Sequence, residues 1–220
     1  GTITSTVSVN QKAGFSIVGY TGTGAAATVG HGLGVKPSLT IIKRRNLSVD
    51  WVVYTDTIDG SWDFLALNTT AAKGNTTVFS ADADTFDFSA SSTTGNVSGG
   101  DAIAYCFAEV EGFSKFGSYT GNGSTGGPMV WTGHRPAFIM VKRTDSTGNW
   151  TILDDVREGY NVDNDPLYPN LSNAEGTADL ADLLSNGFKL RSTDASVNAN
   201  NGTYIFMAFA ESPFKYSNAR

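Results

Sequence analysis

Short apolar segments alternate with clusters of glycine, asparagine, serine and threonine along the whole chain. Four of these segments are rich in β-branched and aromatic residues, which favour strands: 38–43 (SLTIIK), 51–54 (WVVY), 85–89 (TFDFS) and 102–110 (AIAYCFAEV). Clusters such as 21–34 and 120–128 contain the residues that turns require. The pattern predicts an all-β fold.

One segment has helical rather than strand spacing. In residues 173–187 (NAEGTADLADLLSNG), Leu180, Leu183 and Leu184 fall on one side of a helix, and Gly187 provides a stop. We therefore expect one short helix, in the second half of the chain.

Two strands are apolar on both faces. Residues 101–109 (DAIAYCFAE) alternate small with bulky side chains and turn polar only at the end, and residues 136–142 (PAFIMVK) are equally apolar. The outer face of such a strand needs a cover, either from another part of the chain or from another subunit. We expect rigidly docked domains and a homo-oligomer.

The chain repeats itself. The phrase GFSIVGYTGTG (14–24) returns as GFSKFGSYTGNG (112–123), and two longer blocks align without gaps. A shift of 99 residues lays 36–56 over 135–155 and matches Pro37 to Pro136, and a shift of 102 lays 86–109 over 188–211 and matches Phe86 to Phe188. The sequence is a tandem duplication.

The duplication divides the chain into two domains. Residues 14–111 and 112–220 are each the size of a small β-sandwich, and we expect two tandem, jelly-roll-like sandwiches. Residues 1–13 are polar and resemble a connector or a cut end. No linker separates the repeats, since the strand ending at Glu111 runs directly into Gly112.

Composition narrows the function classes. The net charge is -6 and the pI is about 4.8, which argues against nucleic-acid binding, because that requires clustered Lys and Arg. The single cysteine, Cys106, allows neither an intrachain disulfide nor a structural zinc site. No run of eighteen apolar residues occurs, so we expect no membrane insertion.

Residue types that carry catalysis are present without a convincing motif. His31 and His134 stand among turn residues, where we expect them at the surface, and no nucleophile elbow accompanies them. Cys106 lies in the middle of an apolar strand, which favours a buried side chain over a nucleophile. We expect a protein that is not an enzyme and needs no cofactor.

Charged residues that recur in both repeats indicate a structural role for these residues. Glu109 and Glu211 occupy the same place in the two copies, as do the Lys-Arg pairs at 43–44 and 142–143. A residue that occurs at the same place in both repeats is most simply explained by the fold. We therefore expect these acids to pair with those bases across neighbouring strands.

Aromatic residues found in only one repeat are the better site candidates. Trp62, Trp131, Tyr160 and Tyr168 have no counterpart, and Asn161 follows Tyr160. An exposed ring beside Asn and Asp is typical of sugar binding, because the ring covers apolar C–H faces while polar side chains bind hydroxyls. Equally, an unmatched ring can pack beneath a longer loop.

The segment 154–187 is strongly acidic, with eight carboxylates against one Arg. Asn161, Asp163 and Asp165 alternate like the start of a calcium loop, but Pro166 and Ser172 stand where an EF-hand needs Gly and Glu. This excludes an EF-hand. The sequence favours a solvated acidic loop, with an irregular calcium site at Asp163 and Asp165 as the alternative.

Several phrases together resemble a known family. The run AYCFAEVEGFSKFGSYTGNG, the turn HGLGVKP, NGFKLRSTD and the closing MAFAESPFKYSNAR look like a domain near the C-terminal ends of tail-fibre and other virion proteins of tailed bacteriophages, many of them marine. The resemblance covers about residues 14–220. It implies a virion structural or adhesion module, usually in a trimeric fibre, and transfers no catalytic residue.

Three functions remain open. The first is a trimeric virion module, at a tail fibre or surface, that contacts other virion proteins, is assembled in the host cytoplasm and binds a bacterial surface polysaccharide without cleaving it. The second is a purely structural fibre or capsid decoration domain. The third is a glycan-cleaving tailspike enzyme with its carboxylates in the acidic segment.

Overall fold

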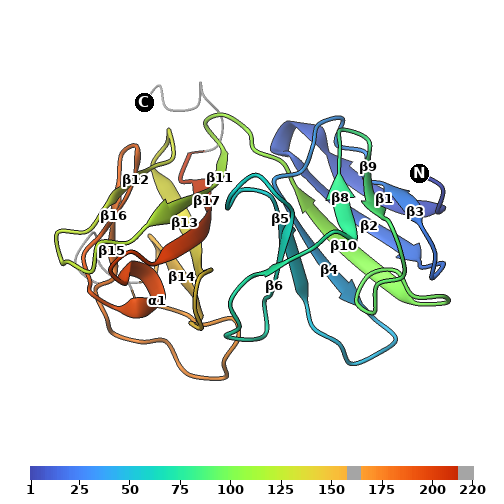
Figure 1. Ribbon diagram of the computed structural model, residues 1–220. Coiled ribbons are helices and arrows are strands. Elements are labelled where there is room, and N and C mark those ends of the chain that lie inside the picture. Colours follow the sequence, from blue (N-terminus) through green and yellow to red (C-terminus); the bar gives the residue numbers. More distant parts are fainter. Residues whose placement is uncertain (158–164, 213–220) are drawn as a thin grey trace. The chain divides into compact units, whose positions relative to one another are not determined.

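The computed structural model describes residues 1–157 and 165–212 (Figure 1). Secondary structure is almost entirely antiparallel strand, arranged in four sheets. Within the described ranges no helix is long and apolar enough to cross a membrane. The chain forms two compact units, each with its own internal contacts.

Unit 1 comprises Gly1–Leu67 and Gly74–Glu109. Its large sheet has the strand order β1 (Ser5–Asn10), β2 (Phe15–Thr21), β10 (Asp101–Phe107), β4 (Leu39–Arg44), β5 (Val52–Thr55), β6 (Asp63–Ala66) and β7 (Gly74–Asn75). Its small sheet has the order β3 (Ala27–Gly30), β9 (Thr85–Phe88) and β8 (Phe79–Ala81). Val18, Ile42 and Ala104 from the large sheet share one core with Val29, Phe86 and Phe88 from the small one.

Unit 2 comprises Asn68–Lys73 and the chain from Val110 onward. Its larger sheet has the order β11 (Ser114–Thr120), β17 (Thr203–Ala210), β13 (Pro136–Arg143) and β14 (Trp150–Asp154). The smaller has the order β12 (Met129–Trp131), β16 (Gly187–Leu190) and β15 (Ala181–Leu184). Ile139, Val141 and Phe206 of one sheet pack with Val130, Leu183 and Phe188 of the other.

The predicted fold class is confirmed: two sandwich-like halves carry the duplication, and the second contains one short helix. The order β2-β10-β4-β5 of unit 1 reappears as β11-β17-β13-β14, and β3-β9-β8 reappears as β12-β16-β15. Register repeats as well, because Val29 pairs with Phe86 as Val130 pairs with Phe188.

The position of the helix differs from the expectation. Residues 181–184, predicted to be helical, form β15, and Leu183 pairs with Phe188 across a two-residue loop. The helix is α1 (Ala195–Asn198), which begins where the Asp194 side chain accepts a hydrogen bond from Ser196 N at 2.7 Å. The spacing of the leucines fitted either structure, and pairing with β16 decided for a strand.

The start of the chain also belongs to the fold. Residues 1–13, expected to be a connector, contain β1, which pairs with β2 along its full length. Ile3 forms a parallel bridge with Val29 and is buried in the core of unit 1. Alternating Thr and Val in a polar segment is the pattern of a solvent-exposed edge strand.

A buried asparagine explains why the glycine-rich phrase occurs twice. Asn96 accepts a hydrogen bond from Thr23 N at 2.9 Å and donates to Ala25 O at 2.6 Å. Asn198 makes the corresponding bonds, from Asn122 N at 2.8 Å and to Ser124 O at 2.8 Å. Each asparagine thereby bonds one donor and one acceptor of the turn backbone in its half.

The glycines of this turn are needed for close approach. A Cβ on Gly22 would lie 2.5 Å from Val97 O, and one on Gly121 would lie 2.4 Å from Ala199 O. The tyrosine before each turn is equally conserved between the halves: Tyr20 donates to Gly95 O at 2.8 Å and Tyr119 to Val197 O at 2.7 Å. The repeated phrase is therefore scaffold.

Candidate functional site

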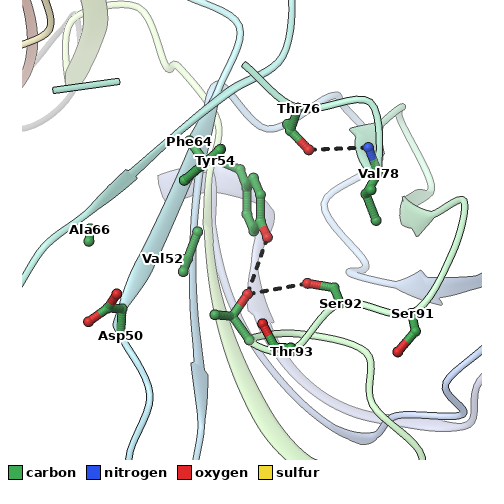
Figure 2. Close-up of a pocket in the computed structure, with 11 residues that line it drawn as sticks. Asp50, Val52, Tyr54, Phe64, Ala66, Thr76, Val78, Ser91, Ser92 and Thr93 are labelled. Carbon is green, nitrogen blue, oxygen red and sulfur yellow. Dashed lines mark hydrogen bonds between the residues drawn. The ribbon is translucent and has the colours of Figure 1, made fainter. Parts of the chain in front are cut away.

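One candidate site is a hollow of about 370 Å³ on unit 1 (Figure 2). Strands β5 and β6, the segment that follows β7 and the loop before β10 surround it. Its lining combines apolar side chains with hydroxyl groups: Asp50, Val52, Tyr54, Phe64, Ala66, Thr76, Val78, Ser91, Ser92, Thr93 and Thr94. The volume lies in the range of small-ligand sites.

Hydroxyl groups form a connected row along one side of the hollow. The Tyr54 hydroxyl lies 3.5 Å from Thr94 Oγ1, which lies 3.2 Å from Ser92 Oγ (Figure 2). Thr76 Oγ1, on the other side, accepts a hydrogen bond from Val78 N at 3.1 Å. Hydroxyls both donate and accept, so this row suits a ligand that is itself rich in hydroxyls.

Phe64 supplies an exposed aromatic surface at the hollow. Its side chain is 41% exposed, although it lies opposite Tyr54 on the same face of the sheet, whereas Asp63 and Leu65 on either side of it are buried. Gly74, paired with it on β7, leaves room for the ring, because a Cβ there would lie 2.5 Å from two ring carbons. The ring is thus held in place and open to solvent.

Trp62, predicted to bind ligand, lies next to this hollow rather than in its lining. It is partly buried against the core and meets Phe79 edge-on, with ring centroids 5.1 Å apart. Phe79 in turn stacks on Tyr54 at 4.0 Å, and Thr76 N donates to Trp62 O at 3.0 Å. Trp62 therefore bonds Thr76 directly and packs behind Tyr54 through Phe79, and both of these residues line the hollow.

The charge at the hollow is low. Among its lining residues, all of which the structure describes, Asp50 is the one ionisable carboxylate, and neither His nor Cys is present. A glycosidase needs two carboxyl groups on either side of the scissile bond. The arrangement therefore suits binding of a sugar better than its hydrolysis.

Trp131, the second predicted aromatic, lies on unit 2. It ends β12 and is 61% exposed, more than Trp51 at 36%. Its ring lies against Gly133, where a Cβ would come within 3.0 Å of the ring. Trp131 is therefore an exposed aromatic side chain that does not line the hollow.

The remaining predicted residues belong to the acidic segment. Tyr168 is half-buried, and burial raises the pKa of its hydroxyl. Asp165, one of the two predicted calcium ligands, is buried. Tyr160, Asn161 and Asp163 lie outside the described residues. Within residues 1–157 and 165–212, no three His, Cys, Asp or Glu side chains gather as a metal site would require.

Both histidines are buried, which corrects their expected place at the surface. His31 Nε2 lies 3.2 Å from Asp82 O, and its Nδ1 accepts a hydrogen bond from Leu33 N at 3.2 Å. This pattern fits a neutral ring, and burial lowers the pKa of His31. His31 is buried although Gly32 and Gly34 beside it are exposed, so a turn sequence did not mean an exposed histidine.

Cys106 is confirmed as a buried side chain. It lies between Ser16 and Thr40 on the neighbouring strands, and burial raises the pKa of its thiol to about 12. Since the thiolate is the nucleophile, this cysteine is inert.

The predicted ion pairs of the recurring acids are wrong for the second repeat. Glu211 Oε2 lies 2.9 Å from Arg135 Nε, whereas Arg143 pairs with Asp145. The register explains the difference, because Ala210, next to Glu211, lies opposite Pro136 at one end of β17, while Arg143 lies opposite Tyr204 at the other end.

A smaller hollow of about 190 Å³ surrounds this ion pair on unit 2, lined by His134, Arg135, Ser185, Ala210, Glu211 and Ser212. Burial, and then the charge of Glu211, raise the pKa of nearby Asp155, as in many acid catalysts. At the repeat positions of Arg135 and Asp155, unit 1 has Lys36 and Asp56, which form an ion pair. A basic and an acidic residue therefore recur at these two positions, which favours a structural role.

Comparison with known proteins adds one finding. Searches of the curated proteins and of the solved structures gave no significant match. One family model, described as a domain of unknown function (DUF7483), matches residues 1–213, which is nearly the entire chain. The chain therefore belongs to the DUF7483 family.

Proposed function

We propose that the chain is a structural and adhesion module of a bacteriophage virion, at a tail fibre or spike, that binds a bacterial surface polysaccharide without cleaving it. The observation that carries the proposal is the hollow on unit 1, which is lined both by the exposed Phe64 ring and by a row of hydroxyls. The resemblance of the sequence to tail-fibre domains gives the biological setting. In this proposal the module works as a homotrimer beside other virion proteins, after assembly in the host cytoplasm.

The hollow fits a sugar by its chemistry. A pyranose ring has an apolar C–H face, which packs on an aromatic ring, and an equatorial edge of hydroxyls. Tyr54, Ser92 and Thr94 offer hydroxyl partners at that edge, while Val52 and Val78 supply an apolar floor. Asp50 adds an acceptor for a further sugar hydroxyl.

The test measures binding of the purified protein to polysaccharide extracted from candidate host cells, with chain length followed in the same samples. We expect saturable binding and unchanged chain length, and we expect Phe64→Ala to weaken binding by about tenfold or more, since it removes the stacking surface. Thr94→Val, which replaces one hydroxyl by a methyl, should weaken it less.

Trp131→Ala is the matched control, because it removes an exposed aromatic ring that is not part of the hollow. Equal losses in Phe64→Ala and Trp131→Ala would contradict this site. Shortened polysaccharide chains would support the tailspike enzyme instead, and no binding across a broad host panel would support a purely structural decoration domain.

A further inference from the structure

Strand β12 forms one edge of its sheet (Figure 1). Leu190 N donates to Pro128 O at 3.1 Å and Thr132 N donates to Asn186 O at 3.0 Å, so the even-numbered residues direct their backbone groups toward β16. Because these groups alternate in direction along a strand, the N–H and C=O of Met129 and Trp131 point away from the sheet. β12 thus offers a short row of donors and acceptors on its outer side.

Unit 1 has the same edge, and there it is occupied. Val29 on β3 corresponds to Val130, so Thr28 and Gly30 correspond to Met129 and Trp131. The chain start lies along this edge: Ile3 N donates to Thr28 O at 2.9 Å, and Ser5 Oγ donates to Gly30 O at 3.1 Å. The bridge between Ile3 and Val29 is parallel.

No described segment lies along the outer edge of β12 as the chain start lies along β3. Among the described residues, no backbone hydrogen bond reaches the outward groups of Met129 or Trp131. The connection between the repeats is too short for this, since β10 ends at Phe107 and β11 begins at Ser114. Six residues, part of which form the turn from Val110 to Ser114, cannot supply an equivalent of the ten-residue start of unit 1.

The side chains on this edge favour a partner. Met129 is 41% exposed and Trp131 is 61% exposed, whereas unit 1 has a threonine and a glycine at the two positions. Exposed edge strands usually carry charges or proline, which prevent pairing with other chains. Tryptophan and methionine are instead enriched in protein interfaces.

We propose that β12 is a docking edge for an extended strand of another polypeptide, added parallel to β12 as the chain start adds to β3. The partner has a β-branched aliphatic residue directed to the core beside Val130, as Ile3 lies beside Val29. Its two flanking residues lie beside Met129 and Trp131 and are apolar, in place of Thr2 and Thr4. This interaction does not involve the sugar-binding hollow.

The probe is a dye-labelled peptide with the sequence of residues 1–10 (GTITSTVSVN), added to the whole chain and followed by fluorescence anisotropy. We expect measurable binding at peptide concentrations below about 1 mM, as for other strand additions of a few hydrogen bonds. The same peptide with Thr2→Leu and Thr4→Leu should bind several-fold more tightly, because its leucines lie beside Met129 and Trp131.

Met129→Pro tests the contact at the edge, with the peptide that keeps Thr2. It removes the outward N–H that corresponds to Thr28 N, which donates to Thr2 Oγ1 at 2.9 Å in unit 1. The strand keeps its bonds to β16, and proline is tolerated at such edge positions. We expect at least about tenfold weaker peptide binding, with an unfolding midpoint in urea close to that of the unchanged protein. Met129→Ala, the matched control, keeps the N–H and should weaken binding only a few-fold.

If Met129→Pro fails to fold, Trp131→Lys replaces it, since a lysine on an edge strand opposes strand addition while leaving the backbone intact. Peptide binding that is unchanged in the edge variants would overturn the proposal, as would the absence of binding by both peptides at about 1 mM. Concentration-dependent self-association that Trp131→Lys abolishes would also overturn it, in favour of pairing between two copies of this chain.

Discussion

The two halves share one scaffold but use equivalent residues differently. The buried Asn96 and Asn198 make the same bonds to the same turn in both halves. The tryptophans that align in the sequence do not match in this way, because Trp150 is 1% exposed and Trp51 is 36% exposed. A repeated residue therefore marks a repeated backbone position, and burial has to be established for each copy.

The aligned lysines differ in the same way. Lys43 is half-buried and lies 5.8 Å from the centre of the Trp51 ring. Lys142 is buried and donates to Arg143 O at 2.7 Å and to Thr70 O at 3.3 Å. Burial, followed by the charge of Arg143, lowers the pKa of Lys142 to about 8. Thr70 belongs to the segment Asn68–Lys73, which comes from the first repeat in sequence but packs within unit 2.

The largest expected effect separates the two tryptophans. Trp150→Ala should lower the free energy of unfolding by about 4 kcal/mol, because it removes a large side chain that is 1% exposed and leaves a cavity in its place. Trp51→Ala should cost about 1 kcal/mol, since its ring is partly in water, where it stacks on Tyr105 and lies near Lys43. Urea unfolding of both variants measures the difference. Equal losses would show that the aligned residues are energetically equivalent despite their different exposure.

The next effect should be equal in the two halves. Asn96→Ala and Asn198→Ala each remove a buried amide that bonds several partly buried backbone groups, and each should cost about 3 kcal/mol. Asn200→Ala is the control, because Asn200 is exposed and lies two residues from Asn198. Urea unfolding followed by tryptophan fluorescence gives the values. A loss in only one half would mean that the repeated turn is essential in that half alone.

Much of the fold could be predicted from the repeat. Both aligned blocks contain whole strands, so Lys43 of β4 matches Lys142 of β13 and Phe86 of β9 matches Phe188 of β16. The strand at 181–184 could not be told from a helix, because three leucines fit both spacings and its partner strand decided the outcome.

The candidate hollow was not predicted. Its hydroxyl residues Ser91–Thr94 are a polar loop in the sequence, and they reach Tyr54 only through tertiary packing. Phe64 has the sequence pattern of a core residue, because the apolar Trp62, Phe64 and Ala66 alternate with Asp63 and Leu65. The structure instead buries Asp63 and Leu65, so alternation gave no signal that Phe64 is exposed. Unmatched aromatic residues led to Trp62, which supports the hollow without lining it.

The smallest expected effect concerns pH and is confined to unit 1. In the folded protein His31 has a pKa below its usual value, because it is buried, which outweighs the opposing effect of Asp82, Asp84 and Asp87. Protonation would also replace the acceptor that Leu33 N uses with a donor. The unfolded chain therefore binds a proton at a higher pH than the folded one. Stability from this residue is complete above about pH 6.5 and falls as the pH drops below that value.

The matched variant His31→Gln cannot titrate in this range. Between pH 7.5 and pH 5 its unfolding free energy should fall less than that of the unchanged protein. The two decreases should differ by less than about 1 kcal/mol. Urea unfolding at a series of pH values measures both slopes, and subtraction removes the contribution of the carboxylates common to the two proteins. Parallel slopes would mean that His31 keeps its ordinary pKa, in which case its bond to Leu33 N does not hold the ring neutral.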